Sequence, residues 1–362
     1  MKEGYFITGF PGFISEQLIK FWLSESSEKK IYVLVLPAMM KKANETIEKL
    51  MREGMNTSTI HVIEGDITKK DLGLPLPTKE HLQNKIHYVW HLAAVYDLAV
   101  EKSLAYKVNV TGTYHVNEWV KGLPNLKRYV YFSTAYVAGR REGAIRADEL
   151  IRPYQFRNYY EETKYEAEVL VQKCKKEIPI TIFRPSIVKG DKKGATTKFD
   201  GPYYLMNIMD RLRKYGSIPY IGKSSAELNV VPVDYVIAAA DWLSRLDNSA
   251  GKTYHLTDPQ AYPAREIFRF MMMAQIGKKP TYTVPYSLVN KLLRVPYIRK
   301  YLGVERQALD YFQYMGRFVQ DETEKDLAGS TISCPDYLDT LGAMVTYYEQ
   351  HKNNKNLHPP VN

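Results

Sequence analysis

Residues 5–19 read "YFITGFPGFISEQLI" and carry the strongest indication of the chain's architecture. This stretch begins as an apolar strand, turns at two glycines and continues as an amphipathic helix. Gly9 and Gly12 have the spacing of the first two glycines of a dinucleotide-binding loop, whereas Ser15 stands where a third glycine is usual. The first glycine permits a tight turn, and the second lets the backbone approach a pyrophosphate at the helix N-terminus. The stretch therefore predicts a phosphate-binding loop, with an ordinary strand–helix turn as the alternative.

Short apolar runs recur through the first half of the chain. They are continuous rather than alternating, which is typical of strands buried on both faces, and helical patterns separate them. The predicted strands are 4–8, 30–36, 59–65, 85–94, 128–134 and 179–185, and the predicted helices are 15–23, 41–53, 104–120 and 160–174. This alternation predicts an α/β fold with a doubly wound parallel sheet, Rossmann-like, and helices on both faces.

The pattern changes after residue 190. A polar, glycine-bearing segment follows, then a strand and a helix, and from about residue 259 the chain is mostly helical and basic. We expect 1–190 to form a nucleotide-binding domain to which 227–258 return. We expect 191–226 and 259–350 to form a smaller, mostly helical, discontinuous substrate-binding domain, and 351–362 to be a flexible tail.

Composition narrows the classes of partner. The net charge of +10 and the pI near 9.2 favour phosphate-bearing cofactors, coenzyme A-like carriers or anionic membrane surfaces, with an ordinary solvated basic surface as the alternative. No nucleic-acid-binding motif is found, so no nucleic acid partner is expected. Two cysteines, no apolar leader and no run long enough to span a membrane predict a cytoplasmic protein. The eight histidines lack metal-site spacing, and no metal is expected.

Tyr160 and Lys164 form a Y-x-x-x-K pattern on a predicted helix. Residues four apart share a helix face, so the ammonium is expected to lower the phenol pKa and make Tyr160 a proton donor to a carbonyl oxygen. The pattern alone is weak, because Tyr348 and Lys352 repeat it on what we read as an exposed helix. Tyr160, however, follows a strand that ends in Ser133 and Thr134, where a hydroxyl can hold a substrate oxygen.

The end of the second predicted strand bears on cofactor choice. NAD-binding folds usually place an acidic residue there for the ribose 2′-hydroxyl, and here the strand ends "VLVLPAMMKKA" without one. Lys41 and Lys42 lie just beyond. The pattern favours NADP, with NAD and two solvated lysines as the alternative.

Several further motifs occur in order over about the first 260 residues. They are "EGDIT" (64–68), "HLAAVYD" (91–97), "KVNVTGT" (107–113), "YFSTAYVAG" (131–139), "NYYEETKYEAE" (158–168) and "FRPSIVKGD" (183–191). Together with the glycine loop they resemble the extended short-chain dehydrogenase/reductases. "KFDGPYY", "VVPVDYV" and "YHLTDPQ" resemble best the branch of fatty acyl-CoA reductases, male-sterility proteins and thioester reductases.

The resemblance implies roles for matching residues. The implied catalytic residues are Thr134, Tyr160, Lys164 and Asn109, the last as a supporting side chain. The implied cofactor-binding residues are Thr8, Gly9, Phe10, Gly12, Phe13, Ile14, Lys41, Asp66, Ile67, Ala93, Ala94, Ser133, Lys164, Arg184, Pro185 and Ser186. His91 could be catalytic, but a hydrogen-bonded structural histidine is favoured. Ser15, and Leu36 in place of an arginine, depart from the family pattern.

The implied activity is NAD(P)H-dependent reduction of a carbonyl or acyl thioester, with an acyl chain or acyl-CoA as the small-molecule substrate. Two alternatives stay open: an NAD-dependent sugar-nucleotide epimerase/dehydratase or hydroxysteroid-type dehydrogenase, and a non-catalytic NADP-sensing regulator. Residues 284–304 are apolar and basic at helical spacing, and are expected to form a lid helix, with peripheral membrane contact as the alternative. We expect a monomer or a homodimer.

Overall fold

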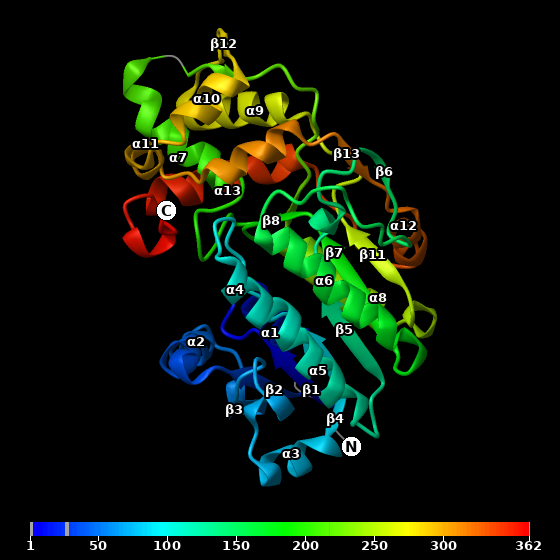
Figure 1. Cartoon of the computed structure of the whole chain (residues 1–362). Helices are drawn as coiled ribbons and strands as arrows, with labels where there is room; N and C mark the ends of the chain where they lie inside the picture. The colour runs from blue at the N-terminus through cyan, green and yellow to red at the C-terminus, as the bar shows by residue number, and fades with distance from the viewer. Residues whose placement is uncertain (1–2, 26–28, 217, 362) are drawn as a thin grey trace.

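The computed structural model describes residues 3–25, 29–216 and 218–361. At its centre lies a seven-stranded parallel sheet in the order β11-β7-β5-β4-β1-β2-β3 (Figure 1). Its strands are β1 (Gly4–Thr8), β2 (Lys30–Val35), β3 (Ile60–Glu64), β4 (Ile86–His91), β5 (Arg128–Phe132), β7 (Ile180–Pro185) and β11 (Thr253–Leu256). The predicted fold class is confirmed. Residues 1–2, 26–28, 217 and 362, which the predicted domain ranges include, lie outside the described residues.

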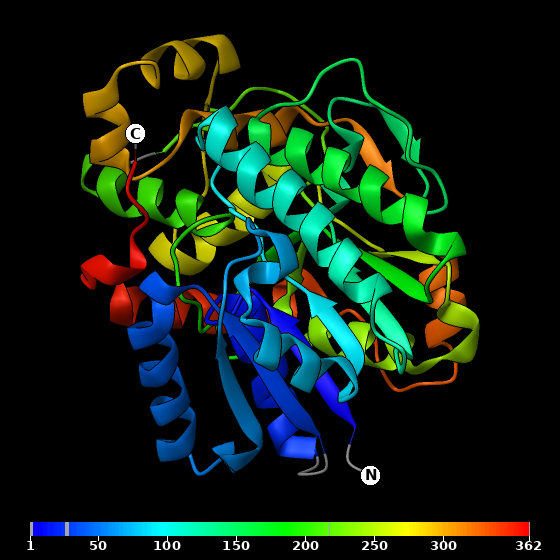
Figure 2. The same ribbon diagram turned by 60° about the horizontal axis from the view of Figure 1, so that its bottom comes forward.

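Helices cover both faces of this sheet (Figures 1 and 2). One face packs against α1 (Phe13–Glu25), α2 (Met40–Arg52) and α8 (Val233–Arg245). The other packs against α3 (Leu76–Gln83), α5 (Gly112–Lys121) and α6 (Tyr159–Lys173). Neighbouring residues of β1 point to opposite faces, with Ile7 in the first cluster and Phe6 in the second. Because both faces are covered, the strands are apolar throughout.

A second body of helices stands beyond the carboxyl ends of the strands (Figure 1). Its core contains residues of α7 (Tyr203–Leu212), α9 (Ala264–Ile276) and α13 (Tyr337–His351). A hairpin of α10 (Tyr286–Leu292) and α11 (Pro296–Leu302) packs on α7. Three small parallel pairs join distant segments: β6 (Gly143–Ile145) with β13 (Gly316–Phe318), β8 (Ile187–Lys189) with β10 (Val230–Pro232), and β9 (Tyr220–Ile221) with β12 (Thr283–Val284).

The chain returns to the sheet twice after residue 190. The strand β11 extends the sheet beside β7. The helix α12 (Asp321–Leu327) then packs on the same side as α8, where Asp326 accepts hydrogen bonds at 2.6 Å from Lys252 and Tyr254. Residues of 321–334 thus pack against the sheet, although they lie within the range 259–350 that we expect for the substrate-binding domain. Lys252, directly before β11, and Tyr254 on β11 hold this segment on the sheet.

The C-terminal residues also differ from expectation. Residues 351–362 were expected to form a flexible tail, but the described part is folded onto the helical body. The Leu357 carbonyl accepts a hydrogen bond of 2.6 Å from the Phe199 amide, and His358 packs edge-on against the Phe199 ring. The helix before it is buried on one face, since Tyr348 donates to Asn207 at 3.0 Å, so the second Y-x-x-x-K pattern is not on an exposed helix.

Candidate functional site

The turn that follows β1 has no room for side chains at its two glycines. Gly9 has φ +90°, and a Cβ added there would lie 2.7 Å from the Ala93 amide nitrogen. A Cβ on Gly12 would lie 2.6 Å from the Gly9 carbonyl oxygen. A side chain at either position would therefore collide with backbone, and at these two glycines only backbone faces the cavity. Such a surface suits a pyrophosphate, so the residues present fit a dinucleotide.

Ser15 replaces the third glycine without disrupting this turn. Its hydroxyl lies 2.9 Å from the carbonyl oxygens of both Gly9 and Gly12, to which it donates, and accepts a hydrogen bond of 3.1 Å from the Gly12 amide. The residue is buried. Ser15 departs from the glycine pattern, yet its hydroxyl links Gly9 to Gly12 and stabilises the loop.

A chain of hydrogen bonds crosses the ends of β1 and β4. Thr8 Oγ1 lies 2.7 Å from His91 Nδ1, and His91 Nε2 lies 3.0 Å from Thr113 Oγ1, which donates to the Asn109 carbonyl. Burial lowers the pKa of His91 to about 3, with the nearby Lys164 ammonium adding to the effect. A neutral histidine bonded on both nitrogens supports the structural role favoured from the sequence.

A cavity of about 1450 Å³ opens along the carboxyl ends of the strands. The predicted site residues that line it are Thr8, Gly9, Phe10, Gly12, Phe13, Ile14, Lys41, Asp66, Ile67, Ala93, Ala94, Ser133, Thr134, Tyr160, Lys164, Pro185 and Ser186. Thr134 follows β5, whereas Tyr160 and Lys164 lie on successive turns of α6. The structure thus brings the glycine turn and the predicted Thr-Tyr-Lys set to one cavity.

The expected electrostatics of this set need correction. Lys164 donates hydrogen bonds to the Tyr131 hydroxyl at 2.9 Å and to the Phe132 carbonyl at 2.6 Å. Burial lowers its pKa to about 7, opposed by the charge of Glu168. Burial also raises the pKa of Tyr160, as does Glu161, whereas a hydrogen bond with Thr134 opposes the rise. Lys164 therefore does not make Tyr160 more acidic in this structure, because its nitrogen is directed at β5.

Asn109 supports the cavity from behind and is not among its lining residues. It lies in a π-helical turn, η4 (Tyr106–Thr111). Its side chain accepts from the Val95 amide at 2.8 Å and donates to Thr163 on α6 at 2.9 Å. Asn109 thereby joins the loop after β4 to the helix that carries Tyr160. π turns of this kind are frequent at functional sites.

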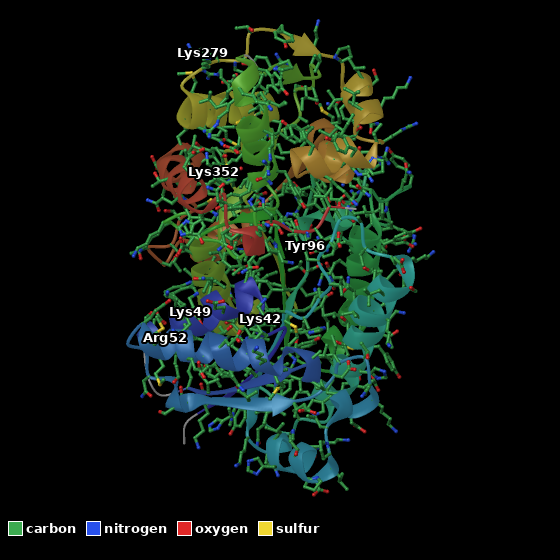
Figure 3. All side chains as sticks on the ribbon, turned by 90° about the vertical axis from the view of Figure 1, so that its left-hand side faces the viewer. Lys42, Lys49, Arg52, Tyr96, Lys279 and Lys352 are labelled. Atoms are coloured by element: carbon green, nitrogen blue, oxygen red, sulfur yellow. The ribbon has the colours of Figure 1, made fainter. Side chains whose placement is uncertain are left out.

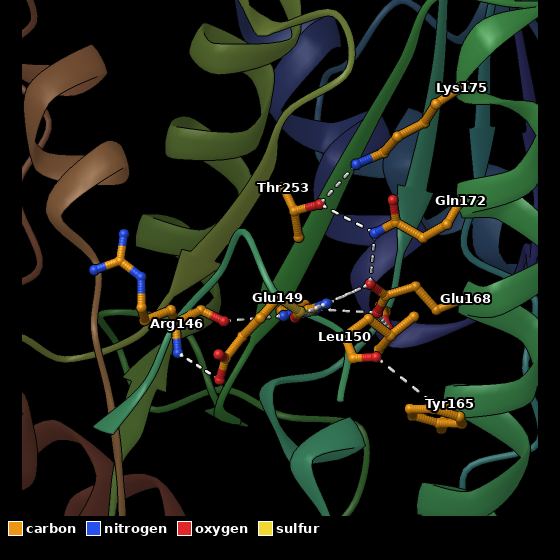
Figure 4. Close-up of polar contacts among 10 residues, drawn as sticks. Arg146, Glu149, Leu150, Tyr165, Glu168, Gln172, Lys175 and Thr253 are labelled. Atoms are coloured by element: carbon orange, nitrogen blue, oxygen red, sulfur yellow. Dashed lines mark hydrogen bonds and ion pairs between the residues drawn. The ribbon is translucent and has the colours of Figure 1, made fainter. Parts of the chain in front are cut away.

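Arg184 is a second residue that the structure places outside the cavity lining. It is buried and donates to Glu168 of α6 at distances from 2.6 to 3.1 Å and to the Glu149 carbonyl at 2.9 Å. Glu168 also accepts from Ser133 at 2.5 Å. Figure 4 shows its further contact with Gln172, at 3.2 Å. The Arg184 guanidinium is thus paired with a buried carboxylate, and the expectation that Arg184 closes over a cofactor stays a prediction. Glu168 was not singled out from the sequence.

Lysines border the end of the cavity beyond β2. Lys41, Lys42 and Lys49 of α2 line it, and Figure 3 shows Lys42 and Lys49 on the side of the molecule that also carries Tyr96. Lys41 is exposed and lies 4.0 Å from Glu45, which also lines the cavity. Lys49 pairs with Glu16 at 2.8 Å. The strand β2 ends at Val35 without a carboxylate.

The opposite half of the cavity is mostly apolar, and few of its residues could be chosen from the sequence. It is lined by side chains that include Leu98, Leu104, Tyr204, Leu205, Ile208, Leu228, Val304, Leu309 and Phe312. Tyr96 meets the Tyr160 ring edge-on, with centroids 5.0 Å apart. Asp200 is the acidic residue in this half, and burial raises its pKa to about 6, opposed by Lys198.

Among the described residues, no group of three or more histidine, cysteine or acidic side chains could hold a metal ion. Likewise, within 3–25, 29–216 and 218–361, none of the helices combines the length and the apolar character needed to cross a bilayer.

Comparison with known proteins agrees with this geometry. Residues 7–240, more than half of the chain, match the family described as male sterility protein. The chain is 25% identical over 273 residues to fatty acyl-CoA reductase wat of Drosophila melanogaster. The aligned region covers 66% of the chain and 53% of that relative. The chain spans about half or less of the length of the first curated relatives it matches.

Solved structures show the same fold. The terminal R domain of the myxalamid PKS-NRPS pathway superposes with a TM-score of 0.82 at 24% identity, covering 98% of this chain and 92% of that one. The structure of UDP-glucuronic acid 4-epimerase from Bacillus cereus in complex with NAD superposes with a TM-score of 0.67 at 20% identity. This superposition covers 96% of this chain and 99% of that one. The chain therefore belongs to the male sterility protein family, and its fold is that of the extended short-chain dehydrogenases/reductases.

Proposed function

We propose that this protein is an NADPH-dependent reductase of acyl thioesters with a long apolar acyl group. The observation that carries the proposal is the single cavity that joins the glycine turn, Thr134, Tyr160 and Lys164 to a half lined by aliphatic and aromatic side chains. An acyl chain would lie in that half with its carbonyl carbon next to Tyr160. The reductases among its relatives support the same substrate class.

The chain's own residues supply binding sites for the parts of the cofactor. The turn at Gly9 and Gly12 and the N-terminus of α1 would hold the pyrophosphate, and Asp66 and Ile67 would flank the adenine. Glu45 offsets the charge of Lys41, so Lys42 is the better candidate for a 2′-phosphate. The Ser186 hydroxyl is buried in the cavity wall and has no hydrogen-bond partner among the described residues, so it is free to bind a ligand. When bound, the nicotinamide supplies a hydride.

Tyr160 and Thr134 would hold the substrate carbonyl oxygen. Since burial raises the pKa of Tyr160, its phenol stays protonated at neutral pH and can donate a hydrogen bond to that oxygen. As negative charge develops on the oxygen, it becomes a stronger base than a phenolate, and Tyr160 passes its proton to it. Thr134 donates a second hydrogen bond. Lys164 orients the site by tying α6 to β5 through Tyr131 and Phe132.

The main alternative is an epimerase or dehydratase of nucleotide sugars, because such an enzyme shares the fold. A nucleotide diphosphate in the substrate half would call for cations there, usually arginines. Among the described residues that line the cavity there is no arginine. A non-catalytic NADP-binding regulator would not need Thr134 and Tyr160 to face the same space as the glycine turn.

The test measures NADPH oxidation with acyl-CoAs of increasing chain length, with aldehydes and with sugar nucleotides, and repeats each with NADH. We expect turnover with long acyl-CoAs, faster with NADPH than with NADH. Tyr160→Phe should abolish turnover and leave NADPH binding intact. The matched control is Tyr348→Phe, which changes the same residue type in the second Y-x-x-x-K pattern and does not line the cavity. No oxidation with any acyl or aldehyde substrate would refute the proposal, and equal loss in both variants would refute the role of Tyr160.

A further inference from the structure

The hairpin of α10 and α11 has an inner and an outer apolar face. On the inner side, Leu293 and Val304 are buried against Tyr204, Ile208 and Leu309. On the outer side, five large apolar residues of the hairpin are exposed: Leu288, Leu292, Val295, Tyr297 and Tyr301. Figure 2 shows the hairpin at the edge of the helical body, away from the N-terminus. The segment that we expect to form one lid helix is thus two short helices, whose inner side is packed and whose outer side leaves these five side chains exposed.

The same segment carries one sign of charge. Residues 278–304 contain six lysines and arginines and no acidic residue. Lys291, Arg294 and Lys300 are exposed on the hairpin itself. Lys214, from the turn after α7, adds another cation, since its ammonium lies 5.0 Å from the Tyr215 ring centroid and 6.0 Å from that of Tyr301. Exposed apolar residues are thus interleaved with cations.

We propose that this outer face docks on the surface of an anionic lipid bilayer. Aromatic and aliphatic side chains enter the boundary between headgroups and acyl chains, while lysines and arginines bind anionic headgroups. A second copy of the chain would place like charges opposite each other across the interface, which is unfavourable. A bilayer matches both the charge and the apolar character of the face.

The docking face is connected to the cavity by one layer of side chains. Tyr204, Ile208, Val304 and Leu309 support the hairpin from below and also line the apolar half of the cavity. A docked hairpin would therefore hold that half next to the lipid. This last step rests on the proposed acyl substrate, whereas the docking itself does not depend on it.

The test is flotation of the full chain with vesicles of phosphatidylcholine alone and with vesicles that also contain phosphatidylserine. We expect binding to the phosphatidylserine vesicles at low salt, weak binding to phosphatidylcholine, and release at high salt. Replacing Lys291, Arg294 and Lys300 together with glutamine should weaken binding by about tenfold or more.

A matched pair of variants separates this face from general surface effects. Tyr297→Glu should reduce flotation strongly, whereas Tyr154→Glu should not, although the two tyrosines are 79% and 80% exposed. Neither lines the cavity, so turnover of a water-soluble substrate should be unchanged in both. Absence of flotation with phosphatidylserine, or equal loss in both variants, would overturn the proposal. A dimer that forms without lipid and that Tyr297→Glu converts to monomers would also overturn the proposal, because the outer face would then be an interface between two copies of the chain. NADPH oxidation is measured without vesicles, so failure of the docking proposal is distinguishable from failure of the proposed function.

Discussion

Lys164 should make the free energy of unfolding depend on pH, and the substitution Lys164→Met should remove this part of the pH dependence. Its side chain is buried, and its pKa falls from 10.5 to about 7 because burial disfavours the ammonium. Below about pH 7 both the folded and the unfolded chain carry the proton, and the cost of burying the charge is constant. Between the two pKa values only the unfolded chain carries it. The free energy of unfolding therefore rises with pH across this window.

The size of the effect follows from the shift. One pH unit within the window corresponds to about 1.4 kcal/mol for a group that titrates in only one state. Because Lys164 is still half protonated near its folded pKa, the gain between about pH 7 and about pH 10 is about 3 kcal/mol. Methionine in Lys164→Met titrates in neither state. The wild-type protein should gain about 3 kcal/mol relative to the variant over this range.

The assay is urea unfolding followed by tryptophan fluorescence, in wild type and Lys164→Met, at several pH values across that range. Trp22 of α1 and Trp90 of β4 are buried in the core on one face of the sheet and report its loss. The other lysines with lowered pKa values, Lys29, Lys175 and Lys189, are common to both proteins, so their contributions cancel in the difference. Parallel stability curves for the two proteins would refute the argument that Lys164 loses its proton on folding.

Three further substitutions test other parts of the site. Gly12→Ala places a Cβ 2.6 Å from the Gly9 carbonyl oxygen and should abolish NADPH binding, measured by fluorescence titration. The circular dichroism spectrum should be unchanged, and normal binding would contradict the assigned loop. Arg184→Met strands the buried Glu168 carboxylate and should lower the free energy of urea unfolding by about 3–5 kcal/mol, and a smaller loss would argue against the pair. Lys42→Gln removes a candidate 2′-phosphate ligand and should raise the KM for NADPH about tenfold while that for NADH stays the same; an equal rise for both would place the 2′-phosphate elsewhere.

Local patterns were sufficient to predict the sheet and the cofactor side of the cavity. A strand buried on both faces must be apolar throughout, so the six strands predicted along the first half appear in the structure with small shifts in their ends. The turn between β1 and α1 has so little room that glycine is required at Gly9, and this requirement is visible in the sequence.

Contacts between distant residues could not be read in the same way. The direction of the Lys164 ammonium depends on Tyr131, 33 positions away, and the partner of Arg184 is set by how α6 crosses β7. The return of residues 321–334 to the sheet depends on Asp326 meeting Lys252 and Tyr254 across more than 70 positions. No periodicity in the sequence encodes such pairings, and each bears on a prediction about the site or its domains.

The interleaving of the two bodies sets a limit on how this scaffold can be re-engineered. The chain passes from the sheet to the helical body and back through β10 and β11, and again through α12. Neither body is a continuous segment, so cutting the chain at one point would leave both incomplete. A chimera that borrows the apolar half of the cavity from a relative would have to graft several separate segments and preserve every crossing. Point changes at Leu98, Ile208 or Leu309 alter the lining of that half within an intact framework.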